Sequence, residues 1–228
     1  MSIDFELTAL EKDFVDAIAR RRLADVDACL EKGVSLHFVA GYFEERPLHL
    51  AAQANAPEII ARLVEKGARV DVLDQQGQTP LFHAADKNAA DAALILLQLE
   101  ANPNHVAYTG RTAIFGAASR GFSEVIDVLT GNGADANFPV NGATALFWAV
   151  NNSHYDAALA LVRGGARVDF RNERGMTAGE VAQQKNSDYR PDRLLVQFLN
   201  AAHLEGAATT GTENHLTVRK PLSFKPSK

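Results

Sequence analysis

The sequence predicts an all-α solenoid of stacked helix-turn-helix units, and three observations support this prediction. A seven-residue phrase recurs along the chain at a nearly constant interval, and a second apolar segment with helical spacing follows it. A glycine-bearing turn then usually separates that segment from the next copy. Short helices of this kind cannot bury their apolar faces alone, whereas stacked copies can.

The recurring phrase sets the period of the stack. Its copies start at residues 46, 79, 112, 144 and 177, so successive starts lie 33, 33, 32 and 33 residues apart. A drift of one residue over the whole array indicates a structural repeat rather than chance. The copies read "RPLHLAA", "TPLFHAA", "TAIFGAA", "TALFWAV" and "TAGEVAQ".

Each phrase is predicted to form the first helix of its unit. The Thr79 hydroxyl can cap the helix, and Pro80 suits the first helical position because its missing N–H would be unpaired there. The paired alanines that follow let neighbouring helices approach closely. In the first copy Arg46 replaces the capping threonine, and the turn before it is one residue longer than the turn before Thr79.

The apolar segment after each phrase is predicted to form the second helix. In the first full unit, Ile59, Ile60, Leu63 and Val64 fall on one helical face. The same pattern recurs in the segments "ADAALILLQLEANPN", "SEVIDVLTGNGADAN" and "YDAALALVRGGARVD".

Glycines mark the ends of most second helices. Gly67, Gly133 and Gly165 stand where the backbone must turn left-handed, a conformation that glycine adopts at least cost. Glu100 occupies the same place in the third unit, where the strain relative to glycine is roughly 1 kcal/mol. We therefore expect Glu100→Gly to raise the melting temperature.

These features resemble the ankyrin-repeat family, whose period and T-P-L-H-x-A phrase are matched at "RPLHLA" and across "GARVDVLDQQGQTPLFHAA". The resemblance runs from about Phe14 to Leu199 and implies a solenoid with β-turn fingers, capped at both ends by atypical units. It places an ankyrin-repeat domain at residues 1–205, with units at approximately 10–37, 42–70, 75–104, 108–137, 141–169 and 173–203.

A different composition follows the repeats. Residues 206–228 have no helical period and a net charge of +3, which leaves −8 on residues 1–205. We expect a flexible basic tail there. Two alternatives remain open: the segment "HLTVRKPLSF" is a short partner motif, or the tail folds back over the acidic repeats.

Composition excludes several classes of protein. No run of about 18 apolar residues occurs, which argues against a membrane-spanning helix. The acidic start "MSIDFELTALEKDF" argues against a signal peptide and favours a cytoplasmic location; export is the alternative if a native signal was removed. The net charge of −5 gives no electrostatic reason to expect nucleic acid.

Signatures of catalysis are missing from the sequence. Cys29 is the single cysteine, and no two of the seven histidines have the three- or four-residue spacing of ligands on one helix face. Phosphate-loop and dinucleotide patterns are also absent. We therefore expect no cofactor, no metal and no enzymatic activity; an enzyme with a site between repeats is the less favoured alternative.

The resemblance implies that partners bind at the turn tips, at the x position of each phrase, and just after the alanines. Large aromatics and arginines at such positions are typical of protein interfaces. The candidate partner-binding residues are Tyr42, Phe43, Glu44, Gln75, Gln76, His83, Asp86, Lys87, Tyr108, Arg111, Arg120, Asn141, Trp148, Asn151, Asn152, Glu173 and Arg174.

Some aromatic residues also have a purely structural interpretation. Phe43 can fold under its long turn, and Trp148 can pack on a neighbouring helix. Phe82, Phe115 and Phe147 recur at the histidine position of the phrase, and we favour an apolar ladder between units over a stacking platform for bases.

The sequence thus predicts a protein-protein interaction module that is a monomer when unbound. We expect an adaptor or a stoichiometric inhibitor that holds a folded partner or a peptide against its concave face and fingers. The alternative is a bacterial effector or immunity-type protein that blocks a partner enzyme or toxin.

Overall fold

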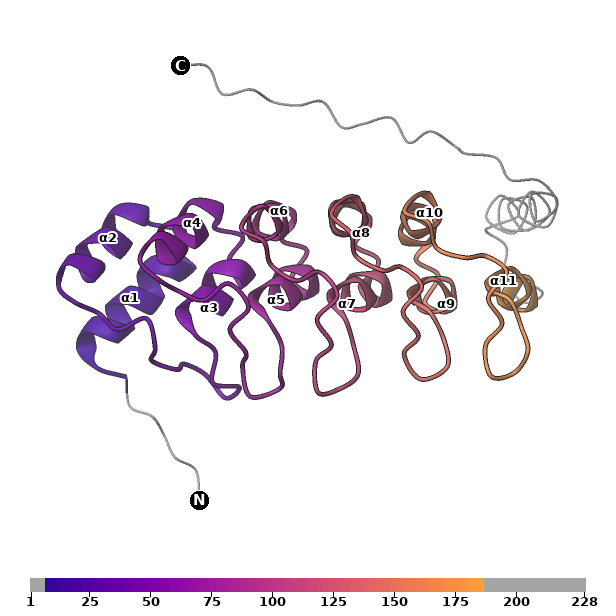
Figure 1. Ribbon diagram of the computed structural model, residues 1–228, viewed down its shortest axis with the longest axis horizontal. Coiled ribbons are helices and arrows are strands. Elements are labelled where there is room, and N and C mark those ends of the chain that lie inside the picture. Colours follow the sequence, from indigo (N-terminus) through magenta and orange to yellow (C-terminus); the bar gives the residue numbers. More distant parts are fainter. Residues whose placement is uncertain (1–6, 187–228) are drawn as a thin grey trace, which may run out of the picture.

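The computed structural model describes residues 7–186, and its helices form two parallel rows (Figure 1). Odd-numbered helices make the inner row and even-numbered helices the outer row. Within residues 7–186 the helices are α1 (Ala9–Ala19), α2 (Leu23–Glu31), α3 (Pro47–Gln53), α4 (Pro57–Glu65), α5 (Pro80–Asp86), α6 (Ala90–Gln98), α7 (Ala113–Arg120), α8 (Ser123–Gly131), α9 (Ala145–Asn151), α10 (Tyr155–Arg163) and α11 (Ala178–Asn186).

The apolar core runs as a continuous seam through the stack. Each inner helix packs against the next inner helix, and each outer helix against the next outer one. Leu48, Leu81, Ile114 and Leu146 occupy the same position of successive phrases and are all fully buried. The alanine pairs beside them are buried too, and their small size permits the close approach. The predicted helical solenoid is confirmed.

A row of phenylalanines joins neighbouring units. Phe82, Phe115 and Phe147 are all buried. The Phe115 ring meets Trp148 edge-on with 5.4 Å between centroids, and Phe147 meets Phe170 in the same way at 6.0 Å. These rings therefore serve as packing between units, as the structural interpretation predicted.

The threonines that start the phrases behave differently from one another. The Thr79 hydroxyl accepts the Phe82 N–H (3.3 Å), which confirms the predicted cap. Thr177 caps α11 in the same way, accepting the Glu180 N–H at 3.2 Å. The buried hydroxyls of Thr112 and Thr144 have no hydrogen-bond partner among the described residues.

The ends of the outer helices follow the glycine pattern. Gly67, Gly133 and Gly165 have φ angles of 96°, 89° and 92°. Glu100, at the same place after α6, has a φ of 66°. Glu100 therefore has the left-handed backbone conformation that the sequence predicts.

Five loops, here called fingers 1 to 5, precede the inner helices and project away from the helical rows (Figure 1). They comprise residues 40–45, 74–78, 107–111, 140–143 and 172–176. Finger 1 closes with an antiparallel bridge between Ala40 and Glu45, which accommodates its predicted extra residue. Finger 4 turns tightly at Asn141 and Gly142 (φ 50° and 69°), a left-handed pair typical of two-residue hairpins. This shorter turn accounts for the single interval of 32 residues.

The description stops within the predicted closing unit. Its finger and its first helix, α11, are described, whereas residues 187–203 of that unit and the predicted basic tail at 206–228 lie outside the described residues. In the part of the chain that is described, no helix has the length and apolar character needed to cross a membrane.

Candidate partner-binding surface

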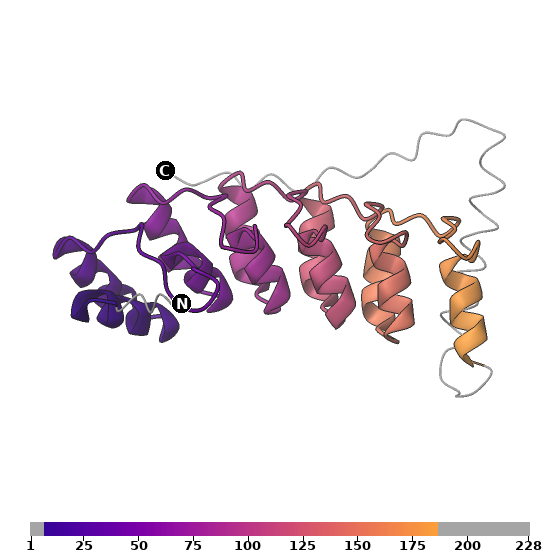
Figure 2. The ribbon, with the colours of Figure 1, turned by 90° about the horizontal axis from the view of Figure 1, so that it is seen from below.

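The fingers stand at one end of the parallel inner helices (Figure 2). Two hollows open between the fingers and the inner helices, and together they are here called the groove. The central hollow, of about 450 Å³, is lined by Phe43, Glu45, Gln53, Gln76, Gln78, Phe82, His83, Asp86, Lys87, Thr109, Arg111, Gly116, Ser119 and Arg120. The C-terminal hollow, of about 370 Å³, is lined by Ala143, Phe147, Trp148, Asn151, Asn172, Arg174, Met176, Val181 and Gln184.

A chain of hydrogen bonds runs under the central hollow. The Gln53 amide donates to Glu45 of finger 1 (2.6 Å) and to Nδ1 of His83 (2.8 Å). On its other side, Nε2 of His83 donates to the buried Asp74 carboxylate at 2.9 Å. His83, predicted as a surface contact, is 7% exposed and lies in the wall of the hollow with both ring nitrogens engaged.

Asp74 organises finger 2 from inside. Its Oδ1 accepts the backbone N–H groups of Gln76 (2.9 Å) and Gln78 (2.8 Å). Burial alone would raise the pKa of Asp74, but the hydrogen bonds from His83 and from these two N–H groups outweigh it and lower the pKa below its usual value. The carboxylate therefore stays charged and holds the finger in one conformation.

His49 fixes the start of α3 to finger 2. The Arg46 N–H donates to Nδ1 of His49 (3.0 Å), and Nε2 donates to the Gln78 carbonyl (3.1 Å). One ring nitrogen must therefore accept and the other donate, which only the neutral imidazole can do. Burial, with a smaller contribution from nearby His83, lowers the pKa of His49 to about 4.

The three basic side chains of the central hollow differ in their partners. Arg120 pairs with Asp86 at 2.7 Å. The Arg111 guanidinium lies over the Phe115 ring, 5.4 Å from its centroid. Lys87 is exposed and, like Arg111, forms no ion pair with any residue between 7 and 186.

Fingers 1 to 3 form a continuous ledge beside the central hollow. The Gln75 N–H donates to the Phe43 carbonyl (2.9 Å), and the Tyr108 N–H donates to the Gln76 carbonyl (3.1 Å). The Tyr108 ring lies against Gly77 of the preceding finger yet remains 75% exposed. Tyr42 is 87% exposed and meets Phe43 edge-on. The ledge therefore presents large aromatic surfaces to solvent.

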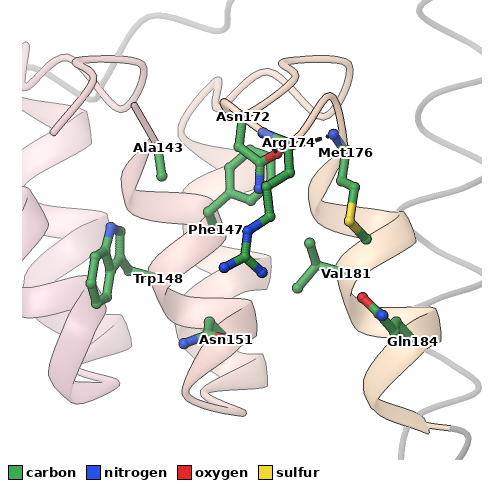
Figure 3. A pocket seen from close by; sticks show the side chains of 9 residues that line it. All are labelled: Ala143, Phe147, Trp148, Asn151, Asn172, Arg174, Met176, Val181 and Gln184. Atoms are coloured by element: carbon green, nitrogen blue, oxygen red, sulfur yellow. Dashed lines mark hydrogen bonds between the residues drawn. The ribbon is translucent and has the colours of Figure 1, made fainter. Parts of the chain in front are cut away.

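The C-terminal hollow lies between α9 and α11 (Figure 3). The Arg174 side chain reaches into it from finger 5, and Val181 of α11 lies on the opposite side from Asn151. Trp148 is half-buried against Phe115, and its indole N–H is buried without a hydrogen-bond partner among the described residues. The structural interpretation of Trp148 as a packing residue thus holds for much of its ring.

The structure brings together only part of the predicted site. The central hollow gathers Phe43, Gln76, His83, Asp86, Lys87, Arg111 and Arg120. The C-terminal hollow gathers Trp148, Asn151 and Arg174. The remaining candidates lie outside both hollows, on the fingers or the helix ends: Tyr42, Glu44, Gln75, Tyr108, Asn141, Asn152 and Glu173.

Several lining residues were missed by the sequence prediction. Glu45, Gln78, Asn172, Met176 and Gln184 line the hollows without belonging to the predicted set. The position of Asn172 carried a signal, because it begins finger 5 as Asp74 begins finger 2, and its Oδ1 likewise accepts finger N–H groups. The others carried none, since their place depends on how adjacent units pack.

The described residues include no group of three or more histidine, cysteine or acidic side chains arranged to hold a metal ion. Cys29, the lone thiol of the chain, is buried in the core.

Comparison with known proteins gives two matches. A family model described as "Ankyrin repeats (3 copies)" matches residues 14–107 and 100–172. Human neurogenic locus notch homolog protein 1 is 31% identical over 148 residues, which is 64% of this chain but 6% of that protein. The alignment thus spans a small part of the relative's length.

Proposed function

Because the chain belongs to the ankyrin-repeat family, we propose that it holds a partner protein in the groove between its fingers and inner helices, as an adaptor or a stoichiometric inhibitor. Ankyrin repeats are generally modules of protein-protein interaction. The observation that carries the proposal is the convergence on the central hollow of Phe43 from one unit with Lys87 and Arg111 from the next two.

The chemistry of this surface supports a protein partner. Tyr42 and Tyr108 offer rigid, largely exposed rings, and aromatic residues together with arginine supply most binding energy at protein interfaces. The ledge of fingers 1 to 3 and the wall of the hollow are already ordered by hydrogen bonds, so less conformational entropy is lost on binding.

The proposal is tested by affinity capture from cells that produce the protein naturally. Tyr108→Ala combined with Arg120→Ala should weaken capture of a discrete partner by roughly a hundredfold or more. Both side chains are exposed, so the double variant should fold normally.

A matched control uses the opposite face of the stack. Leu94→Ala with Glu124→Ala removes two exposed side chains from the outer helices α6 and α8 and should leave capture unchanged. If the outer-face variant loses the partner while the groove variant keeps it, the binding surface is on the other side. Titration of a captured enzyme with this protein then separates an inhibitor, which stops activity at one equivalent, from an adaptor.

A further inference from the structure

One inner helix lacks a side chain where it borders the central hollow. Gly116 occupies the x position of its phrase, in the interior of α7. The corresponding residues of the other inner helices carry side chains: Leu50, His83, Trp148 and Val181.

Nothing in the packing requires a glycine at this place. Gly116 is not among the residues with a positive φ, so its backbone suits any residue. A Cβ built on it would meet Phe82 Cζ at 3.9 Å, an ordinary van der Waals contact, and no other atom as close. Glycine inside a helix is less stable than alanine. Gly116 therefore makes the folded chain less stable than alanine would, and it leaves open space above Phe82.

The side chains that line this space carry a small net positive charge. Lys87, Arg111 and Arg120 line the hollow together with the carboxylates of Glu45 and Asp86, in a chain of net charge −5. Both carboxylates are engaged, Glu45 by the Gln53 amide and Asp86 by Arg120. Lys87 and Arg111 are left without an anion among residues 7–186.

We propose that the central hollow binds an extended acidic segment of the partner protein. One apolar side chain of that segment enters the space above Gly116 and contacts Phe82. Aspartate or glutamate residues beside it pair with Lys87 and Arg111, so charge complementarity selects the segment. This inference rests on the proposed function and specifies the chemistry of its partner.

The chain's own basic segment at 206–228 fits this hollow poorly. Its net charge of +3 has the same sign as Lys87 and Arg111. A basic segment would therefore be repelled by the cations that an acidic one satisfies.

The test is selection of random peptides displayed on phage against the full chain, followed by fluorescence titration of the enriched peptides. We expect enriched peptides to combine Asp or Glu with a large apolar residue. Lys87→Glu with Arg111→Glu should weaken their binding at least roughly tenfold. The matched control, Lys32→Glu with Arg69→Glu, makes the same change in net charge at exposed sites that do not line the hollow and should leave binding within about twofold.

Gly116→Leu tests the steric part of the inference. It should weaken peptide binding at least roughly tenfold, whereas Gly116→Ala should fold and melt at a higher temperature than the natural chain. Enrichment of neutral or basic peptides, an absence of enrichment, or full binding by the Gly116→Leu variant would each overturn the inference.

These results are distinguishable from failure of the proposed function. If the native partner is lost on Tyr108→Ala with Arg120→Ala but retained by Gly116→Leu and by the Lys87 and Arg111 variant, the function stands and the acidic segment is wrong. If the Tyr108 and Arg120 variant keeps the partner, the proposed function itself fails.

Discussion

Replacement of Glu100 by glycine should stabilise the protein, because this residue holds a left-handed backbone that its side chain disfavours. Its φ is 66°, and its exposed side chain makes no ion pair with the described residues. The left-handed conformation costs a residue with a Cβ roughly 1–2 kcal/mol. Glycine also increases the conformational entropy of the unfolded chain, which lowers the free energy of unfolding by about 0.4–1 kcal/mol. The expected net gain is therefore about 0.5–1 kcal/mol, or roughly 1–4 °C in melting temperature.

The assay is urea and thermal unfolding followed by circular dichroism. Gly133→Glu is the matched control, since Gly133 occupies the same place one unit later with a φ of 89°. A Cβ there would meet no atom within 4 Å, so backbone strain is the whole cost. This reverse substitution should destabilise by a similar amount. A melting temperature that stays unchanged or falls for Glu100→Gly, while Gly133→Glu behaves as expected, would refute the reasoning.

Three further predictions follow from buried polar groups. Thr79→Val removes a helix cap and should lower the free energy of unfolding in urea by about 1 kcal/mol. Thr144→Val removes a hydroxyl that has no partner among the described residues, so its free energy of unfolding should stay the same or rise. Equal losses in the two variants would contradict this contrast. His49, whose pKa is lowered to about 4, is neutral when folded but protonates below about 6.5 when unfolded, so its contribution is complete above that pH and declines as the pH falls towards 4. Relative to His49→Gln, the natural chain should lose about 2 kcal/mol between pH 7.5 and 5 in urea unfolding, and a pH-independent difference would disprove the assignment. Trp148→Phe should melt no lower than the natural chain, since it discards a buried, unpartnered N–H and keeps a ring against α7; a fall of several degrees would show that the indole has a partner.

Much of the scaffold could be predicted from the sequence because it depends on local rules. The interval between phrases, the helical spacing of Ile59 to Val64 and the left-handed position of Glu100 each follow from residues close in sequence. The longer turn of finger 1 was predicted from a difference of one residue, and its bridge between Ala40 and Glu45 accommodates that residue.

The details of the groove depend on packing between units, and the sequence prediction was less complete there. Trp148 stands at an exposed position by register, yet the Phe115 ring of the preceding unit takes up one side of it. Thr112 and Thr144 share the register of Thr79, yet their buried hydroxyls have no hydrogen-bond partner among residues 7–186. The depth of the central hollow depends jointly on Gly116 and Phe82, which belong to different units.

The hydrogen bonds that connect Glu45 through Gln53 and His83 to Asp74 have a consequence for the speed of recognition. A loop that must search for its bound shape adds a slow step to each encounter, whereas fingers 1 and 2 are already tied to the helices behind them. Association should then be limited by diffusion and by the orientation of the two surfaces, and not by reordering of these two fingers.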